Sequence, residues 1–554
     1  MRSVAESPRL DNSYLLVPGT PTPNGGLHLG HVAGPFLKID VLGRYLRMAG
    51  ATVHVVSGTD GYESYVSLKA HSAGVAPPVV AACFHRRIEE DLRSLDIFHD
   101  AFIDPLEGET RQEHVEWNRT VMRLLTQSGR VITRFEKMPF NPDERRFTVG
   151  CWLVGRCPVC DSPAGGYCCE ACGAVFSPGE LQAADDRLAV GELRWQEFPT
   201  LFLQVDEAEI TRLVEGLGLA REEEAVIEEY LRRVGPILRL TQPMEWGIGW
   251  PVRNDASRSV LFTYTVGQFA FALHCGAHTA LSGHRLNPFD AAADVTTVAS
   301  GGFDNLVANV LGNLGIHQVL PQFRPYDYLL VNRFVNLDGE KFSTSRGHVI
   351  WVADIAAANL DPDPIRYYLA TIAPEGEVTN FTIEGFVDIV NEYLVDKVQR
   401  MTDDASRSAL EIQHPGPETV ASIEAILARL HRALTPGTFS LHDTTRCVSD
   451  WVDDAPGIAR IAPYWWLKTM SLLTFPLMPR WAASVWQQLD PATSEPSLGR
   501  LWQVDTPQRW GSGTDGRVPR RFKLLNPRAV HAALGAAPAT DPWSTEGEVG
   551  GCAS

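Results

Sequence analysis

The residues best suited to chemistry lie near the start of the chain, in the segment Tyr14–His31, YLLVPGTPTPNGGLHLGH. A short apolar run at 15–17 predicts a buried strand, and the Pro and Gly that follow end it. The amphipathic segment Val32–Met48 predicts the next helix. In a doubly wound sheet, such a strand-to-helix turn lies at the carboxyl end of the strand, where helix N–H groups face a bound anion.

The residue types in this turn are suited to binding a phosphate group. Gly25, Gly26 and Gly30 allow the backbone to approach a ligand closely. His28 and His31 can donate hydrogen bonds to phosphate oxygens. The turn therefore predicts a nucleotide site.

A second loop, Asp338–Gly347, follows about three hundred residues later and contains KFSTS. A glycine-bounded loop with a lysine and several hydroxyl groups is suited to closing over a triphosphate. HLGH and KFSTS, in this order, resemble the two signatures of class I aminoacyl-tRNA synthetases. The resemblance implies that the catalytic residues are His28, His31, Lys341, Ser343, Thr344 and Ser345. It implies that ATP is bound by Pro23, Asn24, Gly25, Gly30, Gly302, Asp304 and Lys341.

The implied reaction is attack of an amino acid carboxylate on the α-phosphorus of ATP, with release of pyrophosphate. Catalysis then rests on positioning and on stabilising charge at the phosphoryl oxygens. Mg²⁺ is expected to bridge the phosphates, held largely by substrate oxygens and water. The family's commoner loop has a second lysine where this chain has Thr344, so we expect slower chemistry but not loss of activity.

Asp60 follows a second predicted strand, Thr52–Ser57. A carboxylate at the carboxyl end of this strand faces the same crevice as the first turn. In the synthetases that the sequence resembles, an Asp at this place holds the α-ammonium group of the amino acid. The alternative is an Asp that only caps the next helix.

Cysteines are clustered in two C-x-x-C pairs, Cys157/Cys160 and Cys169/Cys172, with eight residues between the pairs. This spacing is typical of four thiolates around Zn²⁺, and four thiolates leave no open position, so the metal is expected to be structural. Cys168 is the alternative third ligand. The other five cysteines are scattered, which favours reduced thiols over a disulfide framework.

With a zinc knuckle inserted between two catalytic halves, the chain resembles the methionyl-tRNA synthetases in particular. The stretch Met244–Val252 also resembles a stretch of that family. The implied fold is α/β, a Rossmann-type doubly wound parallel sheet with a zinc-knuckle insertion and a C-terminal α-helical bundle. The expected divisions are 1–112 and 232–330 for the two catalytic halves, 113–231 for the insertion, 331–385 for the second signature loop and connecting fold, and 386–554 for the anticodon-binding-like helices and tail.

Length and composition fit this organisation. The 554 residues are enough for several domains, and 44% hydrophobic with 21% charged residues is ordinary for a soluble globular protein. A net charge of −18 argues against a broadly basic nucleic-acid surface, although local patches remain allowed. The sequence has neither an apolar run of membrane-spanning length nor a signal peptide, so we expect a cytoplasmic protein without a membrane partner.

The amino acid pocket implied by the resemblance differs from the family's. Positions that line the methionine thioether with aromatic or aliphatic side chains become threonine or asparagine in this chain, as at Thr20, Thr22, Asn309 and Asn313. Buried polar groups need partners, so these residues predict a smaller or more polar amino acid. A pocket that has drifted but still binds methionine is the alternative. The full predicted set is Thr20, Thr22, Asp60, Tyr264, Gln268, Phe271, Asn309 and Asn313.

The helix that would bind the anticodon also departs from the family, because its recognition positions become Arg400 and Asp404. A carboxylate facing RNA repels phosphate, so recognition of the cognate anticodon is doubtful.

The preferred hypothesis is a ligase that transfers the acyl group to a small-molecule or carrier acceptor instead of tRNA. One example is the hydroxylamine of N6-hydroxylysine in hydrazine biosynthesis, with a separate cupin protein. The alternatives are an ordinary methionyl-tRNA synthetase and a catalytically idle adenylate- or RNA-binding paralog.

Overall fold

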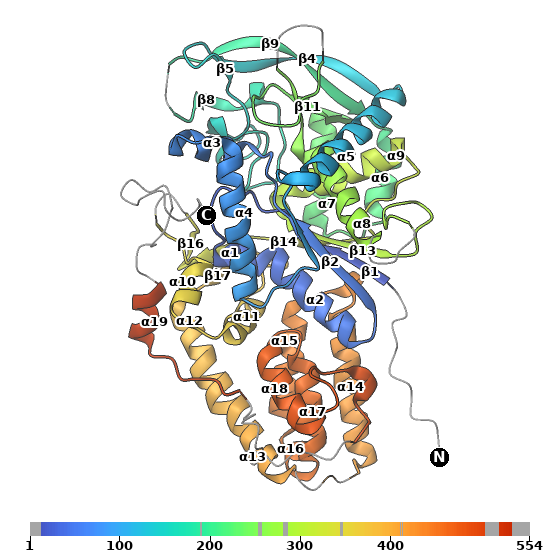
Figure 1. Ribbon diagram of the computed structural model, residues 1–554, viewed down its shortest axis with the longest axis vertical. Coiled ribbons are helices and arrows are strands. Elements are labelled where there is room, and N and C mark those ends of the chain that lie inside the picture. Colours follow the sequence, from blue (N-terminus) through green and yellow to red (C-terminus); the bar gives the residue numbers. More distant parts are fainter. Residues whose placement is uncertain are drawn as a thin grey trace.

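The computed structural model describes residues 13–188, 191–252, 258–280, 286–343, 347–409, 412, 414–504 and 520–534. The molecule is elongated, with three parts along its long axis (Figure 1). An antiparallel insertion lies at the top of this view, a parallel sheet with its helices lies in the middle, and a helical bundle lies at the bottom.

The middle part is built on five parallel strands in the order β14-β13-β1-β2-β3. The chain runs from β1 outward to β2 and β3, and later returns to β13 on the other side of β1. The strand order therefore reverses between β1 and β13, which is where doubly wound sheets bind ligands. The strands are β1 (Ser13–Val17), β2 (Thr52–Gly58), β3 (Ala101–Ile103), β13 (Thr296–Gly302) and β14 (Tyr328–Asn332).

Helices cover both faces of this sheet, as the buried apolar run at 15–17 in β1 requires. The predicted Rossmann-type α/β fold is thus confirmed. Several helices around the carboxyl edge begin with a π-helical turn, an irregularity that is frequent at functional sites. The helices and turns are α1 (Leu29–His31), η1 (Val32–Phe36), α2 (Leu37–Met48), α3 (Ser64–Ala73), α4 (Pro77–Ser94), α5 (Gly108–Gln127), η4 (Thr263–Gly267), α8 (Gln268–Ala280), η5 (Phe303–Asn305), η6 (Val307–Gly312) and α9 (Asn313–Val319).

The insertion is organised around one long antiparallel pair, β4 (Val131–Asn141) with β9 (Arg194–Gln204). A smaller three-stranded sheet holds the cysteine pairs. The remaining elements are β5 (Arg146–Phe147), β6 (Leu153–Arg156), β7 (Pro163–Gly165), β8 (Gln182–Asp186), α6 (Glu207–Glu215), α7 (Arg221–Val234), β10 (Ile237–Arg239), β11 (Thr241–Gln242) and β12 (Val260–Leu261). The division of the chain into domains remains a prediction. Each of the four expected boundaries falls inside an element, namely α5, α7, β14 and α12 (Ile383–Asp388).

After β14 the chain forms a small sheet and then the bundle. The elements are β15 (Val335–Leu337), β16 (Glu340–Lys341), α10 (Val352–Ala357), α11 (Pro362–Thr371), β17 (Thr379–Phe381), α12 (Ile383–Asp388), η8 (Ile389–Gln399), α13 (Arg400–Ser408), α14 (Pro417–Ala433), α15 (Leu441–Asp454), α16 (Pro456–Ile461), α17 (Pro463–Thr474), α18 (Pro479–Leu489) and α19 (Pro527–Leu534).

One buried arginine joins the sheet layer to the bundle. Arg366 of α11 is fully buried, and its Nη2 donates to Asp40 Oδ2 of α2 at 2.6 Å. The same guanidinium donates to the backbone carbonyls of Leu95, Pro476 and Leu477. A continuous apolar core accordingly extends from α2 into α15, α17 and α18.

Among the helices in the described ranges, none combines the length and the apolar character needed to cross a lipid bilayer.

Candidate active site

The first signature loop is held at the carboxyl edge of β1 by α4. Leu27 N donates to Asp91 Oδ2 at 2.8 Å, and Asp91 is itself paired with Arg87 at 2.9 Å. A Cβ at Gly26 would lie 3.2 Å from the Asp91 carboxylate, so a larger residue there would press on the side chain that holds the loop.

The two signatures meet. Backbone hydrogen bonds run from Leu29 N to Ile350 O (3.1 Å) and from Val352 N to Leu27 O (2.9 Å). The His28 ring stacks on Phe342, which belongs to the second signature loop, with 4.8 Å between ring centroids and 6° between planes. The His28 and His31 rings are also stacked, at 3.7 Å. Residues separated by about three hundred positions therefore form one side of one site.

One ring nitrogen of His28, the buried Nδ1, makes no hydrogen bond to the residues that the structure describes. Burial lowers the pKa of His28 well below its usual value, with smaller contributions from His31 and Lys341. A neutral imidazole still has one N–H to donate, and a polyphosphate oxygen is an acceptor of the kind that the signature predicts. The donor set thus fits ATP.

Lys341 lies in β16, opposite β15. Its ammonium group forms an ion pair with Glu170 of the cysteine knuckle, and both side chains are 55% exposed. Ser343 closes the hairpin with His348 through backbone hydrogen bonds of 2.9 and 3.0 Å. The predicted residues Thr344 and Ser345 lie outside the described residues.

The other predicted ATP residues flank this corner of the sheet. Pro23, Asn24 and Gly25 belong to the first loop; Pro23 is buried. Asp304 follows β13 in η5, and burial raises its pKa to about 6. A Cβ at Gly302 would lie 2.3 Å from Asp304 Oδ1, so a larger residue there would force this carboxyl group to move.

Four of the predicted amino acid residues line one small cavity of about 30 Å³: Thr20, Asp60, Gln268 and Phe271. The sequence prediction missed Tyr62, His114 and Asn118, which line the same cavity. The last two lie four residues apart on α5, and Asn118 Nδ2 contacts His114 Nε2 at 3.2 Å. Polar residues at helical spacing on one face of α5 are the only signal that could have identified them.

Asp60 is tied to the first loop, because its N–H donates to Pro21 O at 3.0 Å. Burial raises the pKa of its carboxyl group to about 7, and the like charge of Glu63 adds to the effect. Glu63 caps α3 by accepting from Tyr65 N at 2.7 Å. The helix-capping role considered for Asp60 therefore belongs to Glu63, and Asp60 faces the cavity.

The remaining predicted pocket residues do not line the small cavity. Thr22 lies in the first loop, and its carbonyl accepts from Asn24 N at 2.9 Å. Asn313 is buried and donates to the Asn309 carbonyl at 2.9 Å, while its own Oδ1 has no partner among the described residues. A Cβ at Gly301 would lie 2.4 Å from Asn309 Nδ2, which places that amide against β13.

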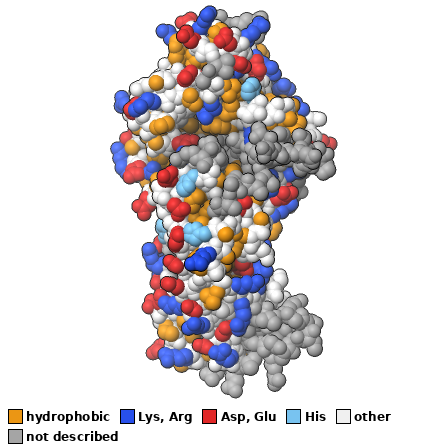
Figure 2. Space-filling view, turned by 90° about the vertical axis from the view of Figure 1, so that its left-hand side faces the viewer, with side chains coloured by type: hydrophobic (Ala, Val, Ile, Leu, Met, Phe, Trp, Pro, Cys, Tyr) orange, Lys and Arg blue, Asp and Glu red, His pale blue; other side chains and the backbone are white. Residues whose placement is uncertain are grey.

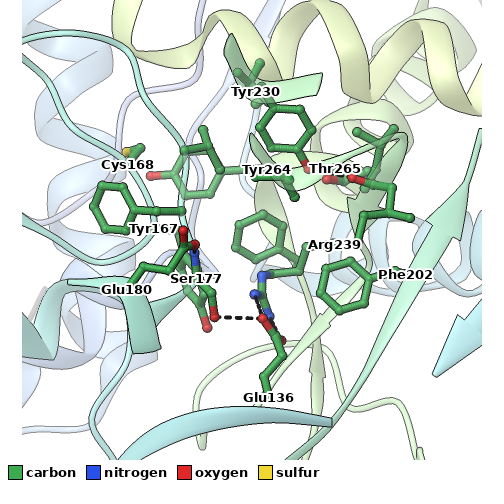
Figure 3. Close-up of a pocket in the computed structure, with 18 of the residues that line it drawn as sticks. Glu136, Tyr167, Cys168, Ser177, Glu180, Phe202, Tyr230, Arg239, Tyr264 and Thr265 are labelled. Carbon is green, nitrogen blue, oxygen red and sulfur yellow. Dashed lines mark hydrogen bonds and ion pairs between the residues drawn. The ribbon is translucent and has the colours of Figure 1, made fainter. Parts of the chain in front are cut away.

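Tyr264 instead lines a second, larger cavity of about 420 Å³, between the insertion and the catalytic sheet (Figure 3). The segment 262–268 separates the two cavities: Thr263 and Gln268 face the small one, whereas Tyr264 and Thr265 face the large one. Burial raises the pKa of Tyr264 well above its usual value, and Glu63, Cys168, Asp60 and Asp304 add to this.

The far wall of the large cavity is built around Arg239 (Figure 3). This buried guanidinium makes a two-point contact with Glu136, at 2.8 and 2.6 Å, and lies 4.7 Å from the Tyr167 ring centroid. The Tyr167 hydroxyl is buried without a partner among the described residues. The cavity is thus lined by aromatic rings and contains an unsatisfied polar group, which suits an organic ligand.

The four predicted metal ligands, Cys157, Cys160, Cys169 and Cys172, converge. Their sulfur atoms all lie within 4.8 Å of one another, the distances Cys157–Cys172 and Cys160–Cys169 being 3.8 and 3.6 Å. Four sulfurs at this spacing can surround one tetrahedral zinc ion. Cys168, the alternative ligand, lines the large cavity instead and is not part of the cluster.

Arg400 and Asp404 are exposed on α13, where each is engaged by a neighbour of opposite charge: Arg400 with Asp396 at 3.0 Å, and Asp404 with Arg407. Along the lower part of the face in Figure 2, the acidic and basic side chains of the described residues are interspersed, and these residues form no continuous basic patch. Neither observation favours strong attraction of RNA phosphates by this face.

Comparison with known proteins agrees with this geometry. The family model described as tRNA synthetases class I (M) matches residues 14–406. The methionine–tRNA ligase of Saccharopolyspora erythraea is 28% identical over 414 residues, which are 68% of this chain and 66% of the relative. That of Cutibacterium acnes is 27% identical over 433 residues, covering 73% and 71% of the two chains. The structure of Mycobacterium tuberculosis methionyl-tRNA synthetase in complex with methionyl-adenylate has a TM-score of 0.67 and 17% identity, with 92% of this chain and 100% of that chain covered.

The family match extends over well over half of the chain and includes the first signature, the knuckle and the second signature. This protein belongs to the class I tRNA synthetases, in the group that contains the methionyl-tRNA synthetases.

Proposed function

We propose that this chain is an ATP-dependent ligase that activates an amino acid as its adenylate and then transfers the acyl group, as methionyl-tRNA synthetases do. The observation that carries the proposal is the contact of His28 with Phe342, which joins the two signature loops at the carboxyl edge of the parallel strands. Mg²⁺ would accompany ATP, held by phosphate oxygens and water.

In this proposal the residues bind and orient, and none acts as a nucleophile. The substrate carboxylate forms a bond to the α-phosphorus, and the bond from that phosphorus to the bridging oxygen breaks, so pyrophosphate departs with the electron pair. His28, through its unpartnered buried nitrogen, and Lys341 hold the phosphates. Asp60 holds the substrate ammonium group beside the first loop. Fixed donors around a developing charge lower the barrier because they need no reorganisation.

Methionine and tRNA are the substrates favoured by the comparisons, because the curated relatives are methionine–tRNA ligases. Methionyl-tRNA synthesis was an alternative in the sequence analysis, and the comparisons support it better than the preferred hypothesis. They give no support to an acceptor other than tRNA or to a role in hydrazine biosynthesis. Zn²⁺ in the four-cysteine knuckle would stabilise the insertion without taking part in the chemistry.

A second candidate keeps the same chemistry and changes the substrates. The small cavity is bordered by Thr20, His114 and Gln268, and the Gln268 Oε1 is buried without a partner among the described residues. If methionine were bound, its thioether would leave these polar wall groups without hydrogen bonds. A substrate amino acid with a polar side chain could form hydrogen bonds with them. The large cavity reaches Asp304 and Tyr264 and could admit a small acceptor.

Amino-acid-dependent exchange of pyrophosphate into ATP, measured over all proteinogenic amino acids, tests the proposal. Exchange with methionine together with charging of total tRNA would establish the first candidate. Exchange with a polar or small amino acid, without charging of tRNA, would establish the second.

Variants show whether the exchange arises at this site. Lys341→Ala should reduce the rate about 10- to 150-fold, because one charge-assisted contact contributes about 1.5–3 kcal/mol. Lys523→Ala, a change at an exposed lysine outside the site, should leave the rate unchanged. Lack of exchange with every amino acid would refute the proposal and favour the idle paralog.

A further inference from the structure

A second group of metal-binding side chains lies outside the adenylate site, where α5 packs against α8. His274 and His278 are four residues apart on α8 and therefore share one face of that helix. Glu113 of α5 lies opposite them. One ligand atom from each of the three residues lies within 4.8 Å of the others.

The contacts inside this group are close. His274 Nε2 lies 3.1 Å from Glu113 Oε2, and the rings of His274 and His278 have centroids 5.2 Å apart. Glu113 is 58% exposed, so a cation could enter from solvent on its side, whereas His274 is fully buried. The group thus has one solvent-exposed ligand and one fully buried ligand.

The two imidazoles also retain unused nitrogens. His274 Nδ1 and His278 Nε2 are buried, and neither has a hydrogen-bond partner among the described residues. Buried imidazole nitrogens normally find partners. His274 faces Glu113 with Nε2 and not with Nδ1, so the unpartnered nitrogen that could reach a shared ion is Nε2 of His278. A cation bound there would also take Nε2 of His274 and the Glu113 carboxylate, since neutral imidazole is a strong ligand for transition metals.

We propose that Glu113, His274 and His278 form a binding site for a divalent transition-metal ion of the zinc type. Two imidazoles and one carboxylate are a donor set that zinc accepts, and three protein ligands leave one position for water. This site is separate from the cysteine knuckle, which offers only sulfur.

The location gives the ion an influence on the small cavity. The His274 ring lies 5.9 Å from that of His114, which lines the cavity with Asp60 and Gln268. A bound ion would fix His274 and, through it, the position of His114. This part of the inference rests on the proposed function, whereas metal binding itself does not.

Metal analysis of the full chain, equilibrated with Zn²⁺ and freed of loosely bound ions, tests the site. We expect two zinc ions per chain. Glu113→Gln and His278→Gln should each lower this number to one, while the control His71→Gln, at an exposed histidine of α3, should retain two. Cys160→Ser should remove the other ion, and combining it with Glu113→Gln should remove both.

Because Glu113 is largely exposed, its amide variant should fold even if a change at buried His274 does not. A single zinc ion per chain that is lost only in Cys160→Ser would overturn the inference and leave Glu113 and His274 as a hydrogen-bonded pair. Two ions that both persist in Glu113→Gln and in His278→Gln would also overturn it. Since the readout is metal content, these outcomes do not depend on whether the chain activates an amino acid.

Discussion

The Asp60 carboxyl group should make amino acid binding depend on pH between pH 6 and 8, where most carboxyl groups are already fully ionised. Its pKa is raised to about 7 by burial and by the charge of Glu63. Only the ionised form can pair with a substrate ammonium group. With a pKa of about 7, about one carboxyl group in eleven is ionised at pH 6 and about ten in eleven at pH 8. The KM for the amino acid should therefore be about tenfold higher at pH 6 than at pH 8.

The assay is the initial rate of pyrophosphate exchange at saturating ATP, with the amino acid varied at each pH. Saturating ATP matters because burial also raises the pKa of Asp304, to about 6, at the nucleotide side. Asp60→Asn should raise KM by about 10- to 150-fold, the value of one charge-assisted hydrogen bond, and should make KM independent of pH over this range.

Glu63→Gln provides the matched control. The amide oxygen can still accept from Tyr65 N and cap α3, but the like charge beside Asp60 is gone. The pKa of Asp60 should then fall, and the rise in KM should move to lower pH. A KM that stays constant from pH 6 to 8 in the original chain, or that is unchanged in Asp60→Asn, would refute the assignment of Asp60 to the ammonium group.

Three further predictions concern the second signature loop, the cysteine knuckle and the contact between the sheet layer and the bundle. Glu170→Gln should increase the apparent affinity for ATP up to about fivefold in exchange assays. The reason is that Lys341 would no longer have to break an exposed ion pair, which contributes at most about 1 kcal/mol, before it binds phosphate. Weaker binding of ATP would contradict this. Cys157→Ser should lower the zinc content by one ion per chain and lower the melting temperature, and an unchanged content would remove the knuckle as a metal site. Arg366→Met should lower the free energy of unfolding by about 3 kcal/mol, since Asp40 stays buried with fewer partners, and a denaturant titration showing less than about 1 kcal/mol would contradict it.

Much of the fold and part of the site could be predicted from local sequence. The strand before HLGH, its glycines and the two cysteine pairs are short-range patterns whose chemistry and geometry are fixed within a few residues. The contact between His28 and Phe342 could be predicted only through the resemblance to a family, because nothing local relates the two loops.

The residues around the small cavity were harder to predict, for two physical reasons. The helical spacing of His114 and Asn118 places them on one face of α5, but it does not reveal that this face reaches the cavity, which depends on the packing of α5 on the distant helix α8. Asn309 lies within the π-helical turn η6 and Asn313 directly after it. A π-helical turn contains an extra residue and so rotates the following side chains relative to an α-helix. A gap-free alignment with α-helical spacing therefore cannot predict where these amides point.

The buried contact of Arg366 with α2 has a consequence for how this protein can be divided. A fragment that ended before α11 would remove Arg366 from Asp40 and expose the apolar flank of α2 to water. All residues predicted for adenylate formation lie before α11. This activity should nevertheless be lost when the chain is truncated just before α11. Changes to the exposed surface of the bundle helices should therefore be tolerated, whereas changes to the face that packs against α2 should not be.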